Sequence, residues 1–281
     1  MSVLVPTTLV DALTILADHP DATVLSGGTD LMVEVNGGHR RLGHVVAVNR
    51  VPELTTWHHD PVAGTLRIGA CIRYAEIERD PIAAWSPALA QAARTVGSPQ
   101  IRHAATIGGN VGTCSPAGDG LPVLSALDAV VELRSAQGVR EVPFGEFMTG
   151  PKRTVRRPGE LITAVIVPVA SGYQGYTKVG VRNAMVIATA SVALVVRRHT
   201  VAIALGSVGP TILRCPEAEE LASSSADFEN GRLAAHVVAE CSELVRRSAR
   251  PIDDHRSTAD YRRHAVGVLA GRLLRRAFPN E

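Results

Sequence analysis

Aromatic residues, net charge and long apolar runs are all scarce in this sequence of 281 residues. Only ten residues are Phe, Trp or Tyr and the formal net charge is +2, so the chain lacks the stacking platforms and the basic face of a nucleic-acid binder. The longest apolar runs, such as residues 190–196, fall short of the ~18 residues of a membrane-spanning helix. No Lys or Arg precedes Arg40, whereas a signal peptide has a basic start. We therefore expect a globular protein without a membrane span.

Clustered cysteines are missing as well. The four cysteines are Cys71, Cys114, Cys215 and Cys241. Because no C-x-x-C pair occurs, the sequence argues against an iron–sulfur cluster or a structural zinc ion within this chain. His58 and His59 lack further ligands at a suitable spacing, and a solvated loop is the simpler interpretation. Scattered cysteines indicate reduced thiols and hence a cytoplasmic protein.

Lysine is nearly absent: Lys152 and Lys178 are the only lysines among 29 basic residues, and the others are arginine. A coding bias that favours arginine over lysine explains most of this skew. A lysine that survives such a bias can nevertheless mark a position that needs a compact ammonium group rather than a flat guanidinium. Nine arginines fall within residues 246–276, which indicates either a solvated helix surface or docking to an acidic partner.

The apolar pattern predicts an α+β chain whose first 170 residues form two lobes, about 1–52 and 53–170. Thr8 is placed to cap a first helix, and Ser86-Pro87 is a typical start of a second. The predicted strands lie at 22–25, 45–48, 65–70, 129–133 and 161–167. The first two strands and the first helix predict a β–α–β-like opening.

A small-residue hinge at 170–172 separates a C-terminal domain over residues 171–281. This domain is expected to contain a three-stranded antiparallel sheet and helices near 232–247 and 259–277. The three strands are predicted at 173–179, 188–197 and 201–205. One face of the last helix should carry Tyr261, Ala265, Leu269 and Leu273.

Two glycine pairs lie about eighty residues apart, in Ser26-Gly27-Gly28-Thr29 and in Thr106-Ile107-Gly108-Gly109-Asn110. Glycine lets backbone N–H groups turn toward an anion, and no Cβ atom blocks the approach. Two such loops would suit a diphosphate held from both sides. Neither matches the dinucleotide-binding or P-loop signature, and plain turns remain an alternative.

Seven segments carry a more specific signal. They are Leu25-Ser-Gly-Gly-Thr-Asp-Leu-Met32, Gly97-Ser-Pro-Gln-Ile-Arg102, Thr106-Ile-Gly-Gly-Asn110, Ser115-Pro-Ala-Gly-Asp119, Gly159-Glu-Leu-Ile162, Lys178-Val-Gly-Val-Arg182 and Ile252-Asp-Asp-His-Arg-Ser-Thr-Ala-Asp-Tyr-Arg262. In order and spacing, the chain resembles the FAD-binding medium subunit of the xanthine dehydrogenase/carbon monoxide dehydrogenase family of molybdenum hydroxylases. The resemblance implies a two-lobed FAD domain of the vanillyl-alcohol-oxidase-like (PCMH) type, followed by the small flavoprotein C-terminal domain.

The resemblance also implies where FAD is held. The implied cofactor-binding residues are Leu25, Ser26, Gly27, Gly28, Thr29, Asp30, Leu31, Thr106, Ile107, Gly108, Gly109, Asn110, Thr113, Ser115, Asp119, Leu161, Ile162 and Lys178. Asp119 would accept a hydrogen bond from a cofactor hydroxyl or amino group, and Leu161 or Ile162 would pack near the adenine. Lys178 would lie near the isoalloxazine, where a cation favours the reduced anionic flavin.

The implied partners are a molybdopterin large subunit and an iron–sulfur small subunit, in a heterotrimer that stands alone or dimerises. Electrons would pass from the iron–sulfur clusters to the flavin and on to an external acceptor. Val186 stands where many relatives have an aspartate, which leaves the identity of that acceptor open. Cys114 is interpreted as a small buried thiol. A free-standing FAD-dependent oxidase or dehydrogenase and a non-enzymatic nucleotide-binding scaffold are the alternatives.

Overall fold

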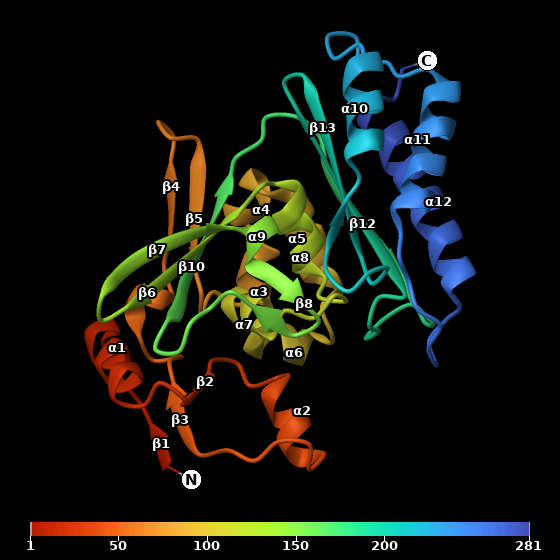
Figure 1. Cartoon of the computed structure of the whole chain (residues 1–281). Coiled ribbons are helices and arrows are strands. Elements are labelled where there is room, and N and C mark those ends of the chain that lie inside the picture. Colours follow the sequence, from red (N-terminus) through yellow and green to blue (C-terminus); the bar gives the residue numbers. More distant parts are fainter. Residues whose placement is uncertain (1, 281) are drawn as a thin grey trace.

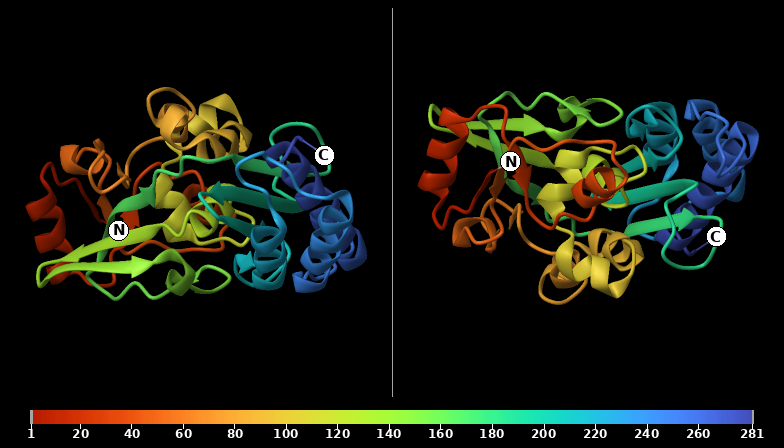
Figure 2. Two further views of the ribbon diagram at one scale, coloured as in Figure 1. Left: turned by 90° about the horizontal axis from the view of Figure 1, so that it is seen from above. Right: turned by 90° about the horizontal axis from the view of Figure 1, so that it is seen from below.

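Three β-sheets of three, five and four strands follow one another along the described residues, and a fourth sheet has only two strands. Helices lie between and around the three larger sheets (Figure 1). The computed structural model describes residues 2–280. The first sheet is parallel, and the next two are antiparallel. Both views in Figure 2 place the first helix (red) and the C-terminal helices (blue) at opposite ends, so the chain crosses the length of the molecule.

A small parallel sheet forms the first lobe. Its elements are β1 (Ser2–Leu4), α1 (Leu9–Asp18), β2 (Thr23–Leu25), α2 (Leu31–Asn36) and β3 (His44–Ala47). The strand order is β1-β3-β2. The predicted helix cap is confirmed, because the Thr8 hydroxyl accepts a hydrogen bond from the Asp11 N–H at 3.1 Å. Strand β1 was not predicted, since three residues show no measurable periodicity.

A five-stranded antiparallel sheet forms the second lobe. Its strands are β4 (Trp57–Asp60), β5 (Thr65–Gly69), β6 (Val130–Ser135), β7 (Gly138–Pro143) and β10 (Leu161–Pro168), in the order β4-β5-β10-β6-β7. The other elements are η1 (Pro52–Leu54), α3 (Tyr74–Ile77), α4 (Ile82–Trp85), α5 (Pro87–Thr95), α6 (Pro99–Ala104), α7 (Ile107–Thr113), α8 (Gly120–Ala126), α9 (Phe144–Phe147), β8 (Met148–Gly150) and β9 (Arg153–Thr154). The interpretation of His58-His59 as a loop was wrong, because both lie in β4.

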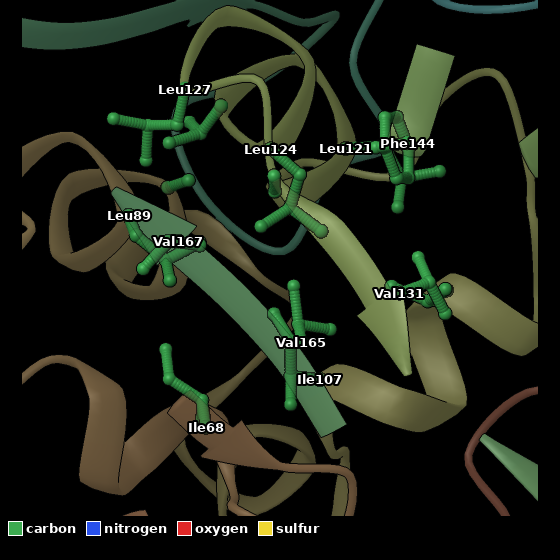
Figure 3. Close-up of a cluster of buried hydrophobic side chains, with 14 of the residues drawn as sticks. Ile68, Leu89, Ile107, Leu121, Leu124, Leu127, Val131, Phe144, Val165 and Val167 are labelled. Atoms are coloured by element: carbon green, nitrogen blue, oxygen red, sulfur yellow. The ribbon is translucent and has the colours of Figure 1, made fainter. Parts of the chain in front are cut away.

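The core of the second lobe lies between this sheet and its helices (Figure 3). Val165 and Val167 of β10 stand two residues apart and therefore point to the same side of the sheet. Figure 3 shows buried residues from strands and helices around them: Ile68, Leu89, Ile107, Leu121, Leu124, Leu127, Val131 and Phe144. This packing fixes the position of α7, on which the second glycine pair lies.

The C-terminal sheet has four strands, and the expected three-stranded sheet is corrected accordingly. The elements are β11 (Gln174–Val179), β12 (Ala190–Arg197), β13 (Thr200–Gly206), β14 (Leu213–Arg214), α10 (Pro216–Ser225), α11 (Ala235–Ser248) and α12 (Ala259–Ala277). Strand β14 pairs with β13 through two residues only, which are too few for an alternating pattern. The bounds of α12 agree with the prediction.

Both faces of this sheet are buried. Val192 and Leu194 of β12 belong to the cluster that contains α10, α11 and α12, which cover one face in Figure 1. Ala193 and Val195, which alternate with them, belong to the core of the second lobe. The C-terminal sheet is therefore a shared wall between two hydrophobic cores.

The long helix α12 differs from its expected pattern at two neighbouring positions, Tyr261 and Arg262. Tyr261 is 48% exposed and does not lie on the buried face, whereas Ala265, Leu269 and Leu273 do. Arg262 is 3% exposed and donates to the carbonyl oxygens of Thr189 and Ser207 at 2.8 and 2.9 Å. Within residues 2–280, no helix is long and apolar enough to cross a membrane.

Candidate functional site

The two glycine segments lie side by side although eighty residues separate them. The Thr106 hydroxyl donates to the Ser26 hydroxyl oxygen at 3.1 Å, which joins the first lobe to the second. The expectation that residues 106–110 form a loop was wrong: Thr106 is the N-cap of α7, and its hydroxyl accepts from the Gly109 N–H at 3.1 Å. A cap residue followed by a Gly-Gly pair carries no clear helical periodicity, which explains the error.

The four glycines serve two purposes. A Cβ atom on Gly27 would lie 1.9 Å from the Ala104 carbonyl oxygen, and one on Gly108 would lie 2.5 Å from the Cβ of Ala70. These two glycines are thus required by close packing within the protein. Gly28 has a φ of +71°, which favours glycine, and Gly109 meets only the Thr106 hydroxyl within 4 Å. Gly28 is therefore required by its backbone conformation, whereas Gly109 leaves room for a ligand.

The backbone donors of the two segments also differ. On α7, the N–H groups of Ile107 and Gly108 are bonded to the carbonyl oxygens of Ile72 and Ala70 at 3.0 and 2.8 Å. In the first segment, no described residue accepts a hydrogen bond from the N–H groups of residues 26–30. Residues 26–29 are half-buried, and consecutive N–H groups without a protein partner form a favourable cradle for an anion. A diphosphate would accordingly receive its backbone hydrogen bonds from the first lobe.

Two further contacts tie α7 to its surroundings. The Thr113 hydroxyl donates to a carboxylate oxygen of Asp30 at 3.2 Å, which brings two predicted site residues together across the lobes. The Asn110 amide oxygen accepts from the Tyr74 hydroxyl at 2.7 Å. Burial raises the pKa of Tyr74, so its hydroxyl stays protonated and remains a donor. The polar side of α7 is therefore held in place from two directions.

Asp119 and Lys178 form a buried ion pair between the second lobe and the C-terminal sheet. Lys178 Nζ lies 2.7 Å from Asp119 Oδ2, and the two side chains are only 9% and 8% exposed. Asp119 also accepts from the hydroxyls of Tyr176 at 2.7 Å and Thr95 at 3.2 Å. Burial raises the pKa of Asp119, while Lys178, Tyr176 and Thr95 favour its ionised form. The carboxylate is thus firmly oriented at the domain junction.

All three N–H bonds of the Lys178 ammonium are used. Besides Asp119, the acceptors are the carbonyl oxygens of Thr95 at 2.9 Å and Val186 at 3.0 Å. Val186, where the resemblance leads one to expect an acidic side chain, therefore contributes its backbone carbonyl. Lys152, in contrast, is 57% exposed and pairs with Glu34 on the surface. The two lysines occupy opposite environments.

The remaining predicted residues are more dispersed. Leu161 packs in the core of the first lobe, whereas Ile162 belongs to that of the second and lies 3.5 Å from a Cβ atom built on Gly112 of α7. The Ser115 hydroxyl accepts from the Ala117 N–H within its own turn. Cys114 is fully buried, and burial raises its pKa to about 12.

Sequence reasoning missed two residues of this region. Tyr176 stands two positions before Lys178 on β11 and so faces the same side, a signal that the strand period contains. Cys71 lies 3.3 Å from the Ser26 hydroxyl, but nothing in a scattered cysteine indicates such a contact. Among the residues described, no group of three or more His, Cys, Asp or Glu side chains could hold a metal ion.

Family comparisons cover almost the whole chain. Residues 1–170 match the FAD binding domain in molybdopterin dehydrogenase. The chain belongs to the molybdopterin dehydrogenase FAD-subunit family. Residues 175–277 match the CO dehydrogenase flavoprotein C-terminal domain, which is the order that the sequence motifs predict. This FAD subunit is therefore an FAD-dependent oxidoreductase component, and the cradle at residues 26–30 fits the diphosphate of that cofactor.

Relatives and solved structures agree with this assignment. The xanthine dehydrogenase FAD-binding subunit of Escherichia coli O157:H7 is 31% identical over 284 residues, which cover 96% of this chain and 93% of the relative. The glyceraldehyde dehydrogenase medium chain of Sulfolobus acidocaldarius is 32% identical, with 93% and 92% covered. A reconstituted CO dehydrogenase from Oligotropha carboxidovorans superposes with a TM-score of 0.90 at 27% identity, over 100% of this chain and 98% of that chain.

Proposed function

We propose that this FAD subunit is the middle electron carrier of a three-subunit molybdenum hydroxylase. Electrons would arrive from the iron–sulfur clusters of a small subunit, which a molybdopterin large subunit fills by oxidising its substrate. The FAD subunit would then deliver them to an external acceptor. The names of the relatives, which include medium chains and FAD-binding subunits of several dehydrogenases, support this place in a larger assembly.

The observation that carries the proposal is the joint between the two lobes. Unpartnered N–H groups of residues 26–30 lie beside α7, and the Thr106–Ser26 hydrogen bond closes the joint. Bound FAD supplies the transfer of electrons, and the protein supplies binding and electrostatics. In this proposal residues 26–30 bind the diphosphate, and Thr113 and Ser115 line the cofactor.

The proposal also includes the domain bounds and the cofactor contacts of individual residues. The FAD domain would be of the vanillyl-alcohol-oxidase-like type over residues 1–170, with lobes of about 1–52 and 53–170, and the small domain would cover 171–281. Leu161 or Ile162 would contact the adenine, and Asp119 and Lys178 would face the flavin end. Because the ion pair is nearly neutral as a unit, its influence on the flavin would come from hydrogen-bond direction more than from net charge.

Reconstitution tests the proposal. We expect the purified chain to take up FAD in a one-to-one ratio and to show flavin absorption. When the reduced iron–sulfur partner is added without oxygen, that absorption should bleach. A chain that shows no flavin absorption after expression with ample riboflavin contradicts the proposal. Steady oxidation of a small substrate by the isolated chain would instead establish the free-standing oxidase.

A further inference from the structure

We propose that Cys71 is a positioning residue for FAD, because its thiol directs the Ser26 hydroxyl toward the diphosphate cradle. The inference rests on the proposed function, since it assumes that residues 26–30 bind the diphosphate. It adds a residue outside the glycine segments, two positions after the end of strand β5, to the machinery of that site.

Cys71 occupies the point where three segments meet. Its sulfur lies 3.3 Å from Ser26 Oγ and 3.6 Å from the carbonyl oxygen of Val48, and its own N–H is bonded to the Leu54 carbonyl at 2.8 Å. The residue is 5% exposed and packs in the core of the first lobe. The thiol is therefore fixed by the backbone and cannot move away from Ser26 without disturbing the lobe.

The hydrogen bonds around Ser26 have a definite direction. The Gly109 N–H donates to the Thr106 hydroxyl, and the Thr106 hydroxyl donates to Ser26 Oγ. Ser26 is then left with one proton to donate. It has two choices: the Cys71 sulfur, which is a weak acceptor, or an oxyanion in the cradle, which is a strong one.

The thiol can reverse its own role when an anion arrives. Burial raises the pKa of Cys71, so the thiol keeps its proton at neutral pH. With an anion in the cradle, the S–H group can donate to Ser26 Oγ and release the Ser26 proton toward the ligand. The Val48 carbonyl, which the thiol gives up, still accepts the N–H of Val51 at 3.1 Å. The exchange leaves no buried polar group without a partner.

If Cys71 only filled space, replacing it would affect FAD binding no more than replacing another buried cysteine. Cys241 provides that control. Cys241 is also buried, and its sulfur lies 3.6 Å from the Ala218 carbonyl oxygen, the same distance as in the Cys71–Val48 contact. It stands on α11, in the other hydrophobic cluster. Cys241→Ala thus removes an equivalent thiol without touching the cradle.

FAD affinity and the phosphorus signals of bound FAD test the inference in the isolated chain. We expect Cys71→Ala to raise the FAD dissociation constant about three- to tenfold, the effect of losing one net hydrogen bond. Cys71→Ser, which restores a donor and acceptor, should bind more tightly than Cys71→Ala, and Cys241→Ala should match the wild type. Phosphorus NMR of bound FAD should shift one diphosphate resonance in Cys71→Ala alone.

The outcomes separate this inference from the proposed function. If the wild type binds FAD and Cys71→Ala binds it equally well with unshifted phosphorus signals, the positioning role is wrong and the function stands. If Cys71→Ala and Cys241→Ala weaken binding alike, the loss is a packing effect, which also overturns the inference. If the wild type takes up no FAD, the proposed function itself fails. Should Cys71→Ala not fold, Cys71→Val, which fills a similar space without a hydrogen-bonding group, takes its place: FAD affinity and phosphorus spectra equal to those of the wild type would contradict a role for the thiol.

Discussion

At the scale of single residues, the two lysines show how environment determines the meaning of a residue type. Lys178 is surrounded by three acceptors on three different segments, and its partner Asp119 is buried with it. A planar guanidinium cannot place its donors on three such points as a compact ammonium does. Lys152 makes one surface ion pair, a type that contributes little to stability.

Replacing each lysine by methionine should separate these environments. Lys178→Met leaves the Asp119 carboxylate buried without its cation, and we expect the free energy of unfolding to fall by about 3 kcal/mol. Lys152→Met, the matched control, should stay within about 0.5 kcal/mol of the wild type. Urea unfolding of the FAD-free chain measures both. Equal losses in the two variants would show that the buried pair is not a significant source of stability.

At the scale of elements, the caps of two helices offer a similar comparison. Thr8 and Thr106 cap α1 and α7 with the same 3.1 Å hydrogen bond to the third helical N–H, but only Thr106 also contacts Ser26. Removing either cap should cost about 1 kcal/mol. We expect Thr106→Ala, and not Thr8→Ala, to weaken FAD binding as well. Thermal unfolding and FAD titration of both variants test this, and unchanged FAD affinity in Thr106→Ala would refute it.

The bulge in β10 depends on a charged cluster. Thr163 is the extra residue between Ile162 and Ala164, and its hydroxyl donates to Glu132, which also pairs with Arg67 at 2.7 Å. Burial raises the pKa of Glu132, but the hydrogen bonds from Arg67, Thr163 and Arg134 outweigh it and lower the pKa to about 2. Since the folded pKa lies below the unfolded value, this stabilisation is complete above about pH 4.5 and lost as the pH falls to about 2.

Glu132→Gln should therefore lower stability in a pH-dependent way. At pH 7 the variant loses the ion pairs, and we expect a loss of about 2 kcal/mol. As the pH falls from about 4.5 toward 2, the wild type loses the same interactions. The difference in free energy of unfolding between the wild type and the variant should therefore shrink. Urea unfolding at a series of pH values measures it. A difference that stays constant with pH would mean that the carboxylate does not titrate as the geometry indicates.

The elements also show what the sequence can and cannot predict. Helix α12 was predicted with its observed bounds because its apolar positions recur over many turns, and the structure adds that Thr258 caps it. Helix α10 was missed, since its polar composition and Ser223–Ser225 favour a loop. The pairing of Asp119 with Lys178 joins residues 59 positions apart, and no local pattern encodes it. Contiguous motifs are sufficient to nominate candidate site residues, whereas contacts that tertiary packing assembles cannot be predicted from them.

At the scale of the whole molecule, the shared wall makes the two domains depend on each other. The face of the C-terminal sheet with Tyr176, Ala193 and Val195 is part of the second lobe's core, and α5 and α8 pack on it. The small alanine side chains on this face allow close approach of those helices. A chain cut at residue 170 would expose an apolar face on both fragments, which a stable domain of this size does not tolerate.

We therefore expect the full chain to unfold in one cooperative transition, although two family models divide it. Calorimetry should give equal calorimetric and van't Hoff enthalpies, and Lys178→Met should shift that one transition as a whole. A fragment of residues 1–170 should aggregate or lack a sharp transition, because it lacks the sheet that closes its core. Two separate transitions in the full chain, or a well-folded 1–170 fragment, would mean that the C-terminal sheet contacts the second lobe but is not needed to complete its core. The FAD site would then depend on the C-terminal sheet only through Tyr176 and Lys178, which both bond to Asp119.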